Sequence, residues 1–357
     1  GVHHALRSRF RAPTDFLRTM PGKAKPNAKR AAERTPAAGE EPRKQKHKRA
    51  PGVEQHTVSL PPPLSVSLPP PRRPLPPHQL VLAPMVAASE LPFRLLCRRH
   101  GAQLCYTPMM HAAEFINPAH VATPNGVGAL QTRPGDAPLV AHFAANDAAT
   151  LLAAAKRAEP YAVAVDINLG CPQRSAHSGH YGSFLTDPGP DRPLVLGMVS
   201  ALARGTRLPV FVKIRLQDTL EETLIFCKQL EAAGCDLIAV HGRVRGHWSH
   251  RRKGPADLLQ IRAVKEVVRC PVLTNGNVSS PEDLLASLAL TGADGVMSAE
   301  GALDDPAIFG RALELRDRER RKLTRKLQEA KALRDAAAAP DAVALSGREQ
   351  RQVARLP

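Results

Sequence analysis

The chain has 357 residues, six cysteines and a formal net charge of +17 at neutral pH. Its length suits one large domain with tails or two domains. The cysteines form no Cys-x-x-Cys pair and no Cys/His cluster at zinc spacing, which argues against a disulfide scaffold and a structural metal. No apolar run approaches the ~18–20 residues of a membrane span. We expect a cytoplasmic or nuclear protein, with a mitochondrion or plastid left open.

The positive charge is confined to the two ends of the chain. Residues 1–77 hold 16 Lys and Arg against 5 Asp and Glu, residues 311–357 hold 13 against 7, and residues 78–310 are neutral. Residues 1–77 are also rich in Pro and Ala, so we expect a disordered basic arm. Basic arms on a neutral body suit a polyanion such as RNA. An equally good alternative to RNA binding is that both ends are simply solvated and bind no partner.

The segment 78–310 alternates apolar runs of strand length with helical patterns. The runs are 79–84, 103–107, 138–143, 162–167, 209–214, 236–240, 271–274 and 294–298. The helical patterns include 89–100, 148–158, 193–203, 220–233, 256–268 and 281–290. Eight runs with helices between them predict an α/β fold, a (β/α)8 TIM barrel, which alone takes roughly 250 residues. Residues 313–327 predict a highly charged helix in a short C-terminal tail, 311–357.

Several runs end in residues that carry chemistry. Cys171 follows the fourth run, Lys213 lies at the penultimate position of the fifth, and His241 directly follows the sixth. Catalytic groups of such barrels collect at the carboxyl ends of the strands, and the loops after the last two strands often bind phosphate. Asn275-Gly276-Asn277 and Ala299-Glu300-Gly301 occupy those two loops, where glycine lets backbone N–H groups approach an anion closely. Taken alone, Asn-Gly is only a turn signal.

The role of Cys171 is open from the residues alone. A lone cysteine is most often a small buried hydrophobe, and an activated thiolate needs a cationic partner. An unperturbed thiol, with a pKa of about 8.5, stays protonated at neutral pH and can give up a proton. That role suits a reduction.

The order of motifs from about residue 79 to 310 resembles the flavin-dependent tRNA dihydrouridine synthases. The Gly179-His-Tyr-Gly182 block and the Ser298-Ala-Glu-Gly301 ending resemble the eukaryotic branch that acts on positions 16 and 17 of the tRNA D-loop. The other matching motifs are Ala83-Pro-Met-Val86, Leu91-Pro-Phe-Arg94, Cys105-Tyr-Thr-Pro-Met109, Asn168-Leu-Gly-Cys-Pro172, Lys213-Ile-Arg215, Val240-His-Gly-Arg243, Lys253-Gly-Pro-Ala-Asp257 and Asn275-Gly-Asn277.

The resemblance implies a barrel that binds FMN, is reduced by NADPH (or NADH) and adds hydrogen across the uracil C5=C6 bond of tRNA. Cys171 would donate the proton to C5, and Asn168 and Arg215 would hold the uracil. The base would leave the stack to reach the flavin. No obligate protein partner is implied. The implied FMN contacts are Pro84, Met85, Val86, His142, Lys213, His241, Asn275, Gly276, Asn277, Ala299 and Glu300.

Three features depart from the family pattern. His142 stands where the family usually has a glutamine that contacts the flavin ring. Ser175, His177 and Ser178 replace basic residues that follow the Cys-Pro pair. The family's C-terminal helical domain is not recognisable after about residue 310, so the tail 311–357 is expected to be a degenerate or truncated tRNA-binding domain.

Two rival functions stay open. The first is a small-molecule FMN oxidoreductase on the same fold, which the basic tails and the lack of a cysteine cluster for iron and sulfur argue against. The second is a non-catalytic RNA-binding relative of the family, which His142 and the missing helical domain favour.

Overall fold

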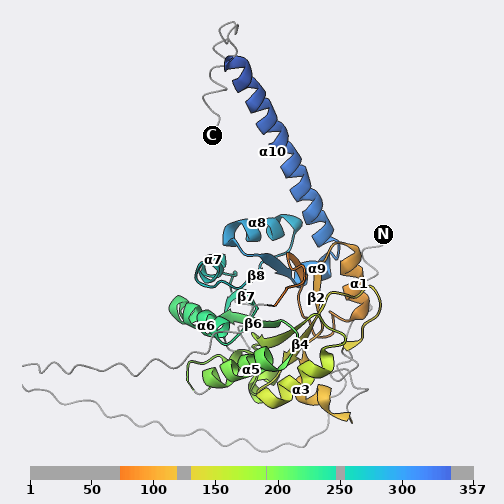
Figure 1. The fold of residues 1–357 in the computed structure, drawn as a ribbon, viewed down its shortest axis with the longest axis vertical. Coiled ribbons are helices and arrows are strands. Elements are labelled where there is room, and N and C mark those ends of the chain that lie inside the picture. Colours follow the sequence, from red (N-terminus) through yellow and green to blue (C-terminus); the bar gives the residue numbers. More distant parts are fainter. Residues whose placement is uncertain (1–72, 119–129, 190, 247–253, 339–357) are drawn as a thin grey trace, which may run out of the picture. The chain divides into compact units, whose positions relative to one another are not determined.

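The computed structural model describes residues 73–118, 130–189, 191–246 and 254–338. At its centre, a parallel sheet closes on itself (Figure 1). Within the described ranges, eight strands form this ring: β1 (Leu80–Leu82), β2 (Leu104–Tyr106), β4 (Leu139–Ala144), β5 (Ala164–Leu169), β6 (Val210–Leu216), β7 (Leu237–Val244), β8 (Val272–Asn275) and β9 (Gly295–Ser298). A two-residue strand, β3 (Met110–His111), pairs with the carboxyl end of β4.

The ring closes through parallel pairs between the first and last strands. β1 pairs with both β2 and β9, and β2 pairs with β4, where Cys105 lies opposite Leu139. The predicted (β/α)8 TIM barrel is therefore confirmed. Each ring strand begins one or two residues inside its predicted run. All the ring strands run in the same direction, so their carboxyl ends meet at one rim of the barrel.

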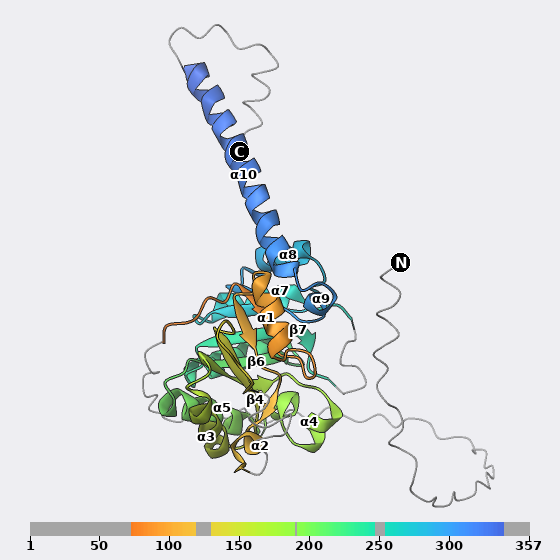
Figure 2. The ribbon, with the colours of Figure 1, turned by 90° about the vertical axis from the view of Figure 1, so that its right-hand side faces the viewer.

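Helices connect the strands on the outside of the ring, as Figures 1 and 2 show from two sides. The longer ones are α1 (Leu91–Arg99), α3 (Ala148–Ala158), α5 (Asp191–Gly205), α6 (Leu220–Ala232), α7 (Leu258–Val267) and α8 (Pro281–Thr291). The short ones are α2 (Ala112–Ile116), α4 (Arg174–Ser178), a 3-10 helix (Gly182–Leu185) and α9 (Glu300–Asp304).

Capping side chains set the first turns of several of these helices. Asp147, Thr219 and Asp257 each accept a hydrogen bond from the backbone N–H three residues later. Ser280 and Asp283 form a reciprocal capping box at the start of α8. These contacts satisfy N–H groups that the helix itself leaves unpaired. Each of these helices therefore begins at a defined residue.

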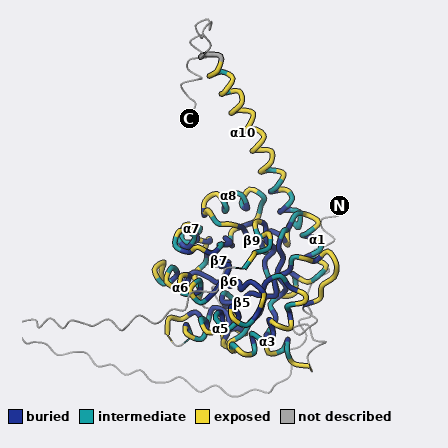
Figure 3. Tube along the Cα trace, viewed as in Figure 1, coloured by how far each residue is buried: buried dark blue, intermediate teal, exposed yellow. Residues whose placement is uncertain are grey.

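The interior of the barrel is apolar at its centre. Alternate residues of the strands meet there and are buried: Val81, Leu104, Tyr106, Val140, Ala164, Phe211, Leu237, Ala239, Leu273 and Met297. A second and larger cluster fills the space between the strands and the surrounding helices. Figure 3 shows the buried strands enclosed by partly exposed helices. The interior is thus a packed core rather than a pore.

A short segment before β1 covers the amino-terminal end of the barrel. Leu75 packs against the interior cluster. Arg73 donates to Asp236 Oδ2 at 3.0 Å and to the carbonyl of Thr206 at 3.2 Å. Asp236 also accepts a hydrogen bond from the N–H of Val210, the first residue of β6. The last residues of the predicted arm therefore contact the barrel.

Helix α10 (Ile308–Ala338) follows the last strand. Its first turns pack against α8 and α9 and bury Ile308, Phe309 and Ala312. From Arg316 to Asp335 the side chains are largely exposed (Figure 3). The division into an arm, a barrel and a tail stays a prediction, because residues 1–72 and 339–357 lie outside the described residues.

Candidate active site

A layer of polar side chains lies at the carboxyl rim, directly above the apolar interior. Residues two positions apart on a strand point to the same side, so each polar residue here follows an interior one. The layer contains His142 above Val140, Asp166 above Ala164, Lys213 above Phe211, His241 above Ala239 and Asn275 above Leu273. Five neighbouring strands thus present hydrogen-bonding groups at one rim.

Cys171 lies in the loop that follows β5, and this loop is fixed by two side chains. Asn168 Oδ1 accepts hydrogen bonds from the N–H groups of Gly170 and Cys171, at 3.1 and 2.9 Å. Arg215 Nε donates to the carbonyl of Gly170 at 3.0 Å. The thiol itself is partly buried. Asn168 and Arg215, which were expected to hold a uracil, therefore also fix the backbone that carries the thiol.

The Gly179-His-Tyr-Gly182 segment supports the same loop. The φ angle of Gly182 is 69°, and a Cβ atom there would lie 2.7 Å from the carbonyl oxygen of Cys171. Ser183 donates to this oxygen from its N–H at 3.1 Å and from its hydroxyl at 3.0 Å. A larger residue at position 182 would push the Cys171 loop out of place. The motif therefore positions the thiol through the backbone of Cys171.

Lys213 connects two strands of the rim. Its Nζ donates to Asn275 Oδ1 at 3.1 Å, and Asn275 Nδ2 donates to the carbonyl of Met297 at 2.9 Å. Burial is the main cause that lowers the pKa of Lys213 from 10.5 to about 8, and the charge of Arg215 acts in the same direction. The ammonium is thus held in place at a cost in solvation.

Three further side chains form a network between β7, β8 and the segment before α7. Arg243 Nη1 donates to His241 Nε2 at 3.0 Å, and Arg243 Nη2 donates to Asn277 Oδ1 at 3.0 Å. The N–H of Ala256 also donates to Asn277 Oδ1, at 3.0 Å. Because Nε2 accepts from Arg243, the imidazole of His241 carries its proton on Nδ1. Nδ1 is therefore the donor that His241 offers.

The electrostatics of the rim keep His241 neutral. Burial is the main cause that lowers the pKa of His241 to about 2. The neighbouring cations Lys213, Arg215 and Arg243 lower it as well. The concentration of positive charge at this part of the rim favours an anionic ligand.

A cavity of about 530 Å³ opens beside this network. It is lined by Pro172, Gln173, Arg215, His241, Arg243, Asn275, Gly276, Asn277, Val278, Ser279, Met297, Ala299, Glu300, Gly301 and Asp304. Its walls combine apolar surface, backbone of the turn after β8 and two guanidinium groups. A cavity of this size and lining can hold a cofactor or a small ligand.

The residues expected to contact FMN or uracil do not all line this cavity. Arg215, His241, Asn275, Gly276, Asn277, Ala299 and Glu300 do. Lys213 donates to the lining residue Asn275, and Cys171 precedes the lining residue Pro172. His142 belongs to the polar layer on β4 and does not line the cavity. Pro84, Met85 and Val86 form the loop after β1, where Val86 is exposed. The structure brings the set to one rim of the barrel, and the individual roles stay predictions.

Gly276 is confined by its neighbours. Its φ angle is 116°, and a Cβ atom there would lie 2.7 Å from Ala256 Cβ and 3.1 Å from the ring of His241. Glycine was expected here because it lets backbone N–H groups approach an anion, and the structure adds a second reason for it. A side chain at position 276 would meet Ala256 and His241, whose positions define the cavity wall.

Sequence reasoning missed two residues of the rim. Arg243 contacts both His241 and Asn277, and its position two residues after His241 on one strand could have indicated this. Asp166 was passed over as part of an apolar run, although it lies two residues before Asn168. A charged residue inside such a run is the signal that could have found it.

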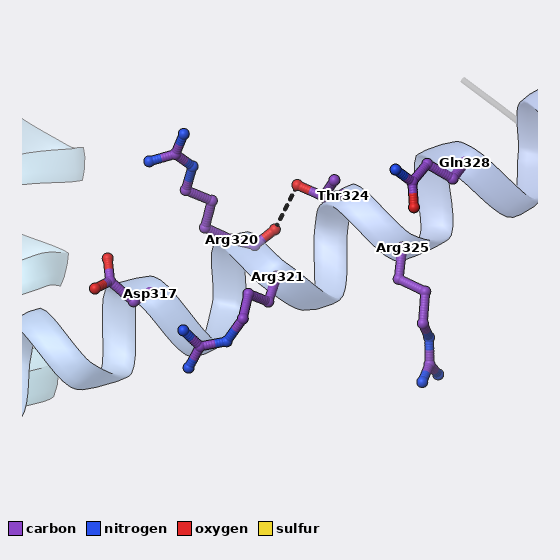
Figure 4. A pocket seen from close by; sticks show the side chains of 6 residues that line it. All are labelled: Asp317, Arg320, Arg321, Thr324, Arg325 and Gln328. Atoms are coloured by element: carbon purple, nitrogen blue, oxygen red, sulfur yellow. Dashed lines mark hydrogen bonds between the residues drawn. The ribbon is translucent and has the colours of Figure 1, made fainter.

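A second concavity lies on the surface of α10. It is lined by Asp317, Arg320, Arg321, Thr324, Arg325 and Gln328. Figure 4 shows that these side chains all come from one helix and that Arg320 and Arg325 extend to opposite sides of it. Thr324 Oγ1 donates to the carbonyl of Arg320 at 2.9 Å. This basic surface is more open than the cavity at the rim.

Comparison with known proteins identifies the family. The sequence profile described as "Dihydrouridine synthase (Dus)" matches residues 81–340. A mouse (Mus musculus) protein named "tRNA-dihydrouridine(16/17) synthase [NAD(P)(+)]-like" is 43% identical over 64% of this chain and 47% of its own length. The human (Homo sapiens) protein named "tRNA-dihydrouridine(20a/20b) synthase [NAD(P)+]-like" is 40% identical over 64% of this chain and 70% of its own length.

This chain spans about half the length of the 16/17 relatives that it matches. Among solved structures, the complex of 2-naphthoyl-CoA reductase has a TM-score of 0.51 at 11% identity, covering 66% of this chain and 50% of that one. Histamine dehydrogenase from Rhizobium sp. 4-9 has a TM-score of 0.50 at 14% identity, covering 69% of this chain and 47% of that one. At these identities the likeness concerns the fold alone.

Proposed function

The chain belongs to the dihydrouridine synthase family, and we propose that it reduces uridine to dihydrouridine at positions 16 and 17 of the tRNA D-loop with FMN as cofactor and NADPH (or NADH) as reductant. The observation that carries this proposal is the placement of Cys171. Its loop is fixed by Asn168 and Arg215 beside a basic cavity at the carboxyl rim.

The residues at the rim fit FMN. The cavity is bordered by Arg215 and Arg243 and by the turn at Gly276, which suits a phosphate that needs cations and close backbone donors. Lys213 is held at the adjoining strand, where an ammonium can face the electron-rich end of the flavin ring. His241 offers Nδ1–H as a hydrogen-bond donor to the flavin ring. Asn275, Asn277, Ala299 and Glu300 would complete the walls on that side, and Pro84, Met85, Val86 and His142 those near β1 and β4.

FMN, when bound and reduced, supplies a hydride to C6 of the uracil ring. The ring then needs a proton at C5, and Cys171 donates it from its thiol. The S–H bond breaks, a C–H bond forms at C5, and the thiolate regains a proton from water. Asn168 and Gly182 keep the thiol in position by holding the backbone on either side of it. A positioned general acid accelerates such a step by roughly 10²–10⁴.

The exposed face of α10 would contact the tRNA. The helix carries ten Lys and Arg residues against five Asp and Glu residues, and all ten cations are exposed. The predicted arm, residues 1–77, adds 16 cations against 5 acids. The barrel segment between them is neutral, so these two regions supply the attraction for the phosphate backbone.

A reconstituted reaction tests the proposal. The full chain is purified, its flavin content is read from the visible absorption spectrum, and unmodified tRNA is incubated with NADPH. Mass spectrometry then maps dihydrouridine. Product at 16 and 17 supports the proposal, and product at 20a and 20b corrects the position. Turnover of free uridine or UMP without turnover of tRNA would favour a small-molecule oxidoreductase, and tRNA binding without flavin or product would favour a non-catalytic relative.

A further inference from the structure

A buried histidine and carboxylate form a close pair in the polar layer. His142 on β4 lies opposite Asp166 on β5 in the parallel register. His142 Nδ1 and Asp166 Oδ2 are 2.5 Å apart, and the two side chains are 2% and 0% exposed. The rings of Tyr106 and His142 pack edge to face, with centroids 5.9 Å apart. The imidazole is thus held from two sides.

Asp166 gains little else from its position. Its second oxygen, Oδ1, is buried and has no hydrogen-bond partner among the described residues. Burial raises the pKa of Asp166, while the hydrogen bond from His142 and the charge of Lys213 oppose the rise. A carboxylate this deep in the barrel costs solvation that an apolar residue would not. Among the described residues its hydrogen-bond partner is the imidazole, so the pair indicates a role for His142.

The pair belongs to the polar layer at the carboxyl rim of the barrel. Val140 and Ala164, two residues earlier on the same strands, belong to the apolar interior, so His142 and Asp166 are the next layer toward the mouth. Lys213 occupies the neighbouring strand of this layer and donates to Asn275, which lines the cavity. With Nδ1 committed to Asp166, the ring nitrogen Nε2 makes no hydrogen bond within the described residues.

We propose that Asp166 is a positioning residue that accepts the Nδ1 proton of His142 and so presents Nε2 as a hydrogen-bond acceptor to the bound flavin. The inference rests on the proposed function, since it concerns the FMN named there. The hydrogen bond at one ring nitrogen decides which tautomer a neutral histidine adopts. The oxidised flavin ring carries one N–H donor, at N3, and an acceptor at Nε2 complements it.

FMN binding should then depend on which tautomer His142 adopts. A purely structural role of Asp166 would not produce this dependence. Asn at position 166 offers both an acceptor and a donor. If its amide N–H donates to Nδ1, the proton of His142 moves to Nε2. The Nε2–H group and the flavin N3–H group are then both donors, and no hydrogen bond forms between them. A glutamine at position 142 has no tautomers and can turn its oxygen toward the flavin whichever residue stands at 166.

A double-mutant cycle on FMN binding tests this. The dissociation constant of FMN is measured by flavin fluorescence for the wild type, Asp166→Asn, His142→Gln and the double variant. We expect Asp166→Asn to weaken binding about tenfold with histidine present, the size of one lost hydrogen bond. In the chain that carries His142→Gln, the same change should alter binding less than about twofold, because no tautomer is left to switch.

A spectroscopic readout accompanies the cycle. With FMN labelled with ¹⁵N at N3, the N3–H resonance should shift between the wild type and Asp166→Asn and stay constant between His142→Gln and the double variant. Circular dichroism and thermal unfolding of the FMN-free proteins check that each variant folds. Equal losses in both backgrounds, or no loss from Asp166→Asn, would overturn the inference and leave the proposed function intact. A wild-type chain that binds no FMN would overturn both.

Discussion

The backbone N–H of Cys171 donates to the side-chain oxygen of Asn168 over 2.9 Å. This bond sets the direction in which the loop leaves β5, because the same oxygen also accepts from Gly170. From the other side, Ser183 binds the carbonyl of Cys171, and Gly182 leaves room for it. The thiol is therefore carried by a backbone that is tied at both its N–H and its carbonyl.

Replacing Cys171 tests its assignment as the proton donor. We expect Cys171→Ala to retain FMN and to be reduced by NADPH, while dihydrouridine formation falls roughly 10²–10⁴-fold, because C5 loses its positioned acid. Single-turnover assays of flavin reduction and product formation separate the two steps. Cys227→Ala, which removes a buried thiol away from the rim, is the control and should keep product formation. Product formation near the wild-type rate by Cys171→Ala would remove the assignment.

The turn after β8 should control FMN retention. Gly276→Ala places a methyl group 2.7 Å from Ala256 Cβ at a φ angle of 116°, so the turn must shift at the wall where we propose that the FMN phosphate binds. We expect this variant to purify with little flavin. Gly197→Ala, where a Cβ atom meets nothing within 4 Å, is the matched control and should keep its flavin. A full flavin content in Gly276→Ala would show that the phosphate binds elsewhere.

Lys213 should give the FMN-free protein a stability that rises with pH. Burial lowers its pKa in the folded protein to about 8, against 10.5 in an unfolded chain. Between these values the unfolded chain binds more protons, so the free energy of unfolding increases with pH, by about 1–3 kcal/mol across the window. Urea unfolding of wild type and Lys213→Met at pH 8 and 10.5 measures this. Equal pH dependence in both proteins would refute it.

The arm should contribute to tRNA binding through its charge. Deleting residues 1–72 removes most of its cations, so log affinity should fall less steeply with log salt than it does for the full chain. FMN content should stay unchanged, because Arg73 and Leu75 still cover the barrel. Identical salt slopes would leave the arm without a role in binding, as expected of a spacer or targeting segment.

Residues 73–77 should make two deletions differ in thermal stability. Removing residues 1–77 also removes Leu75 and the contacts of Arg73 with Asp236 and Thr206. Asp236 would lose a partly buried ion-pair partner, and the interior cluster would lose the apolar side chain that covers it. We therefore expect the 1–77 deletion to unfold at a lower temperature than the 1–72 deletion. Differential scanning fluorimetry of the two truncated chains compares them. Equal midpoints would mean that the segment does not stabilise the barrel.

The sequence was sufficient to predict the ring of strands because each strand lies in a short, mostly apolar run. The helix patterns between these runs added the alternation that a parallel barrel requires. What could not be predicted depends on pairing across strands. The contact of His142 with Asp166 needs the register of β4 against β5, and that of Arg73 with Asp236 joins residues far apart in the chain. Neither leaves a local pattern, whereas Arg243 stands in the motif Val240-His-Gly-Arg243 and was given no role in the site.

We propose that this chain reduces tRNA uridine with Cys171 as the acid. The most direct measurement is mass-spectrometric mapping of dihydrouridine on unmodified tRNA after incubation with the FMN-loaded protein and NADPH. Our account predicts product at positions 16 and 17 with the wild type and at least about a hundredfold less with Cys171→Ala. No dihydrouridine on tRNA from a protein that holds reducible FMN would contradict it.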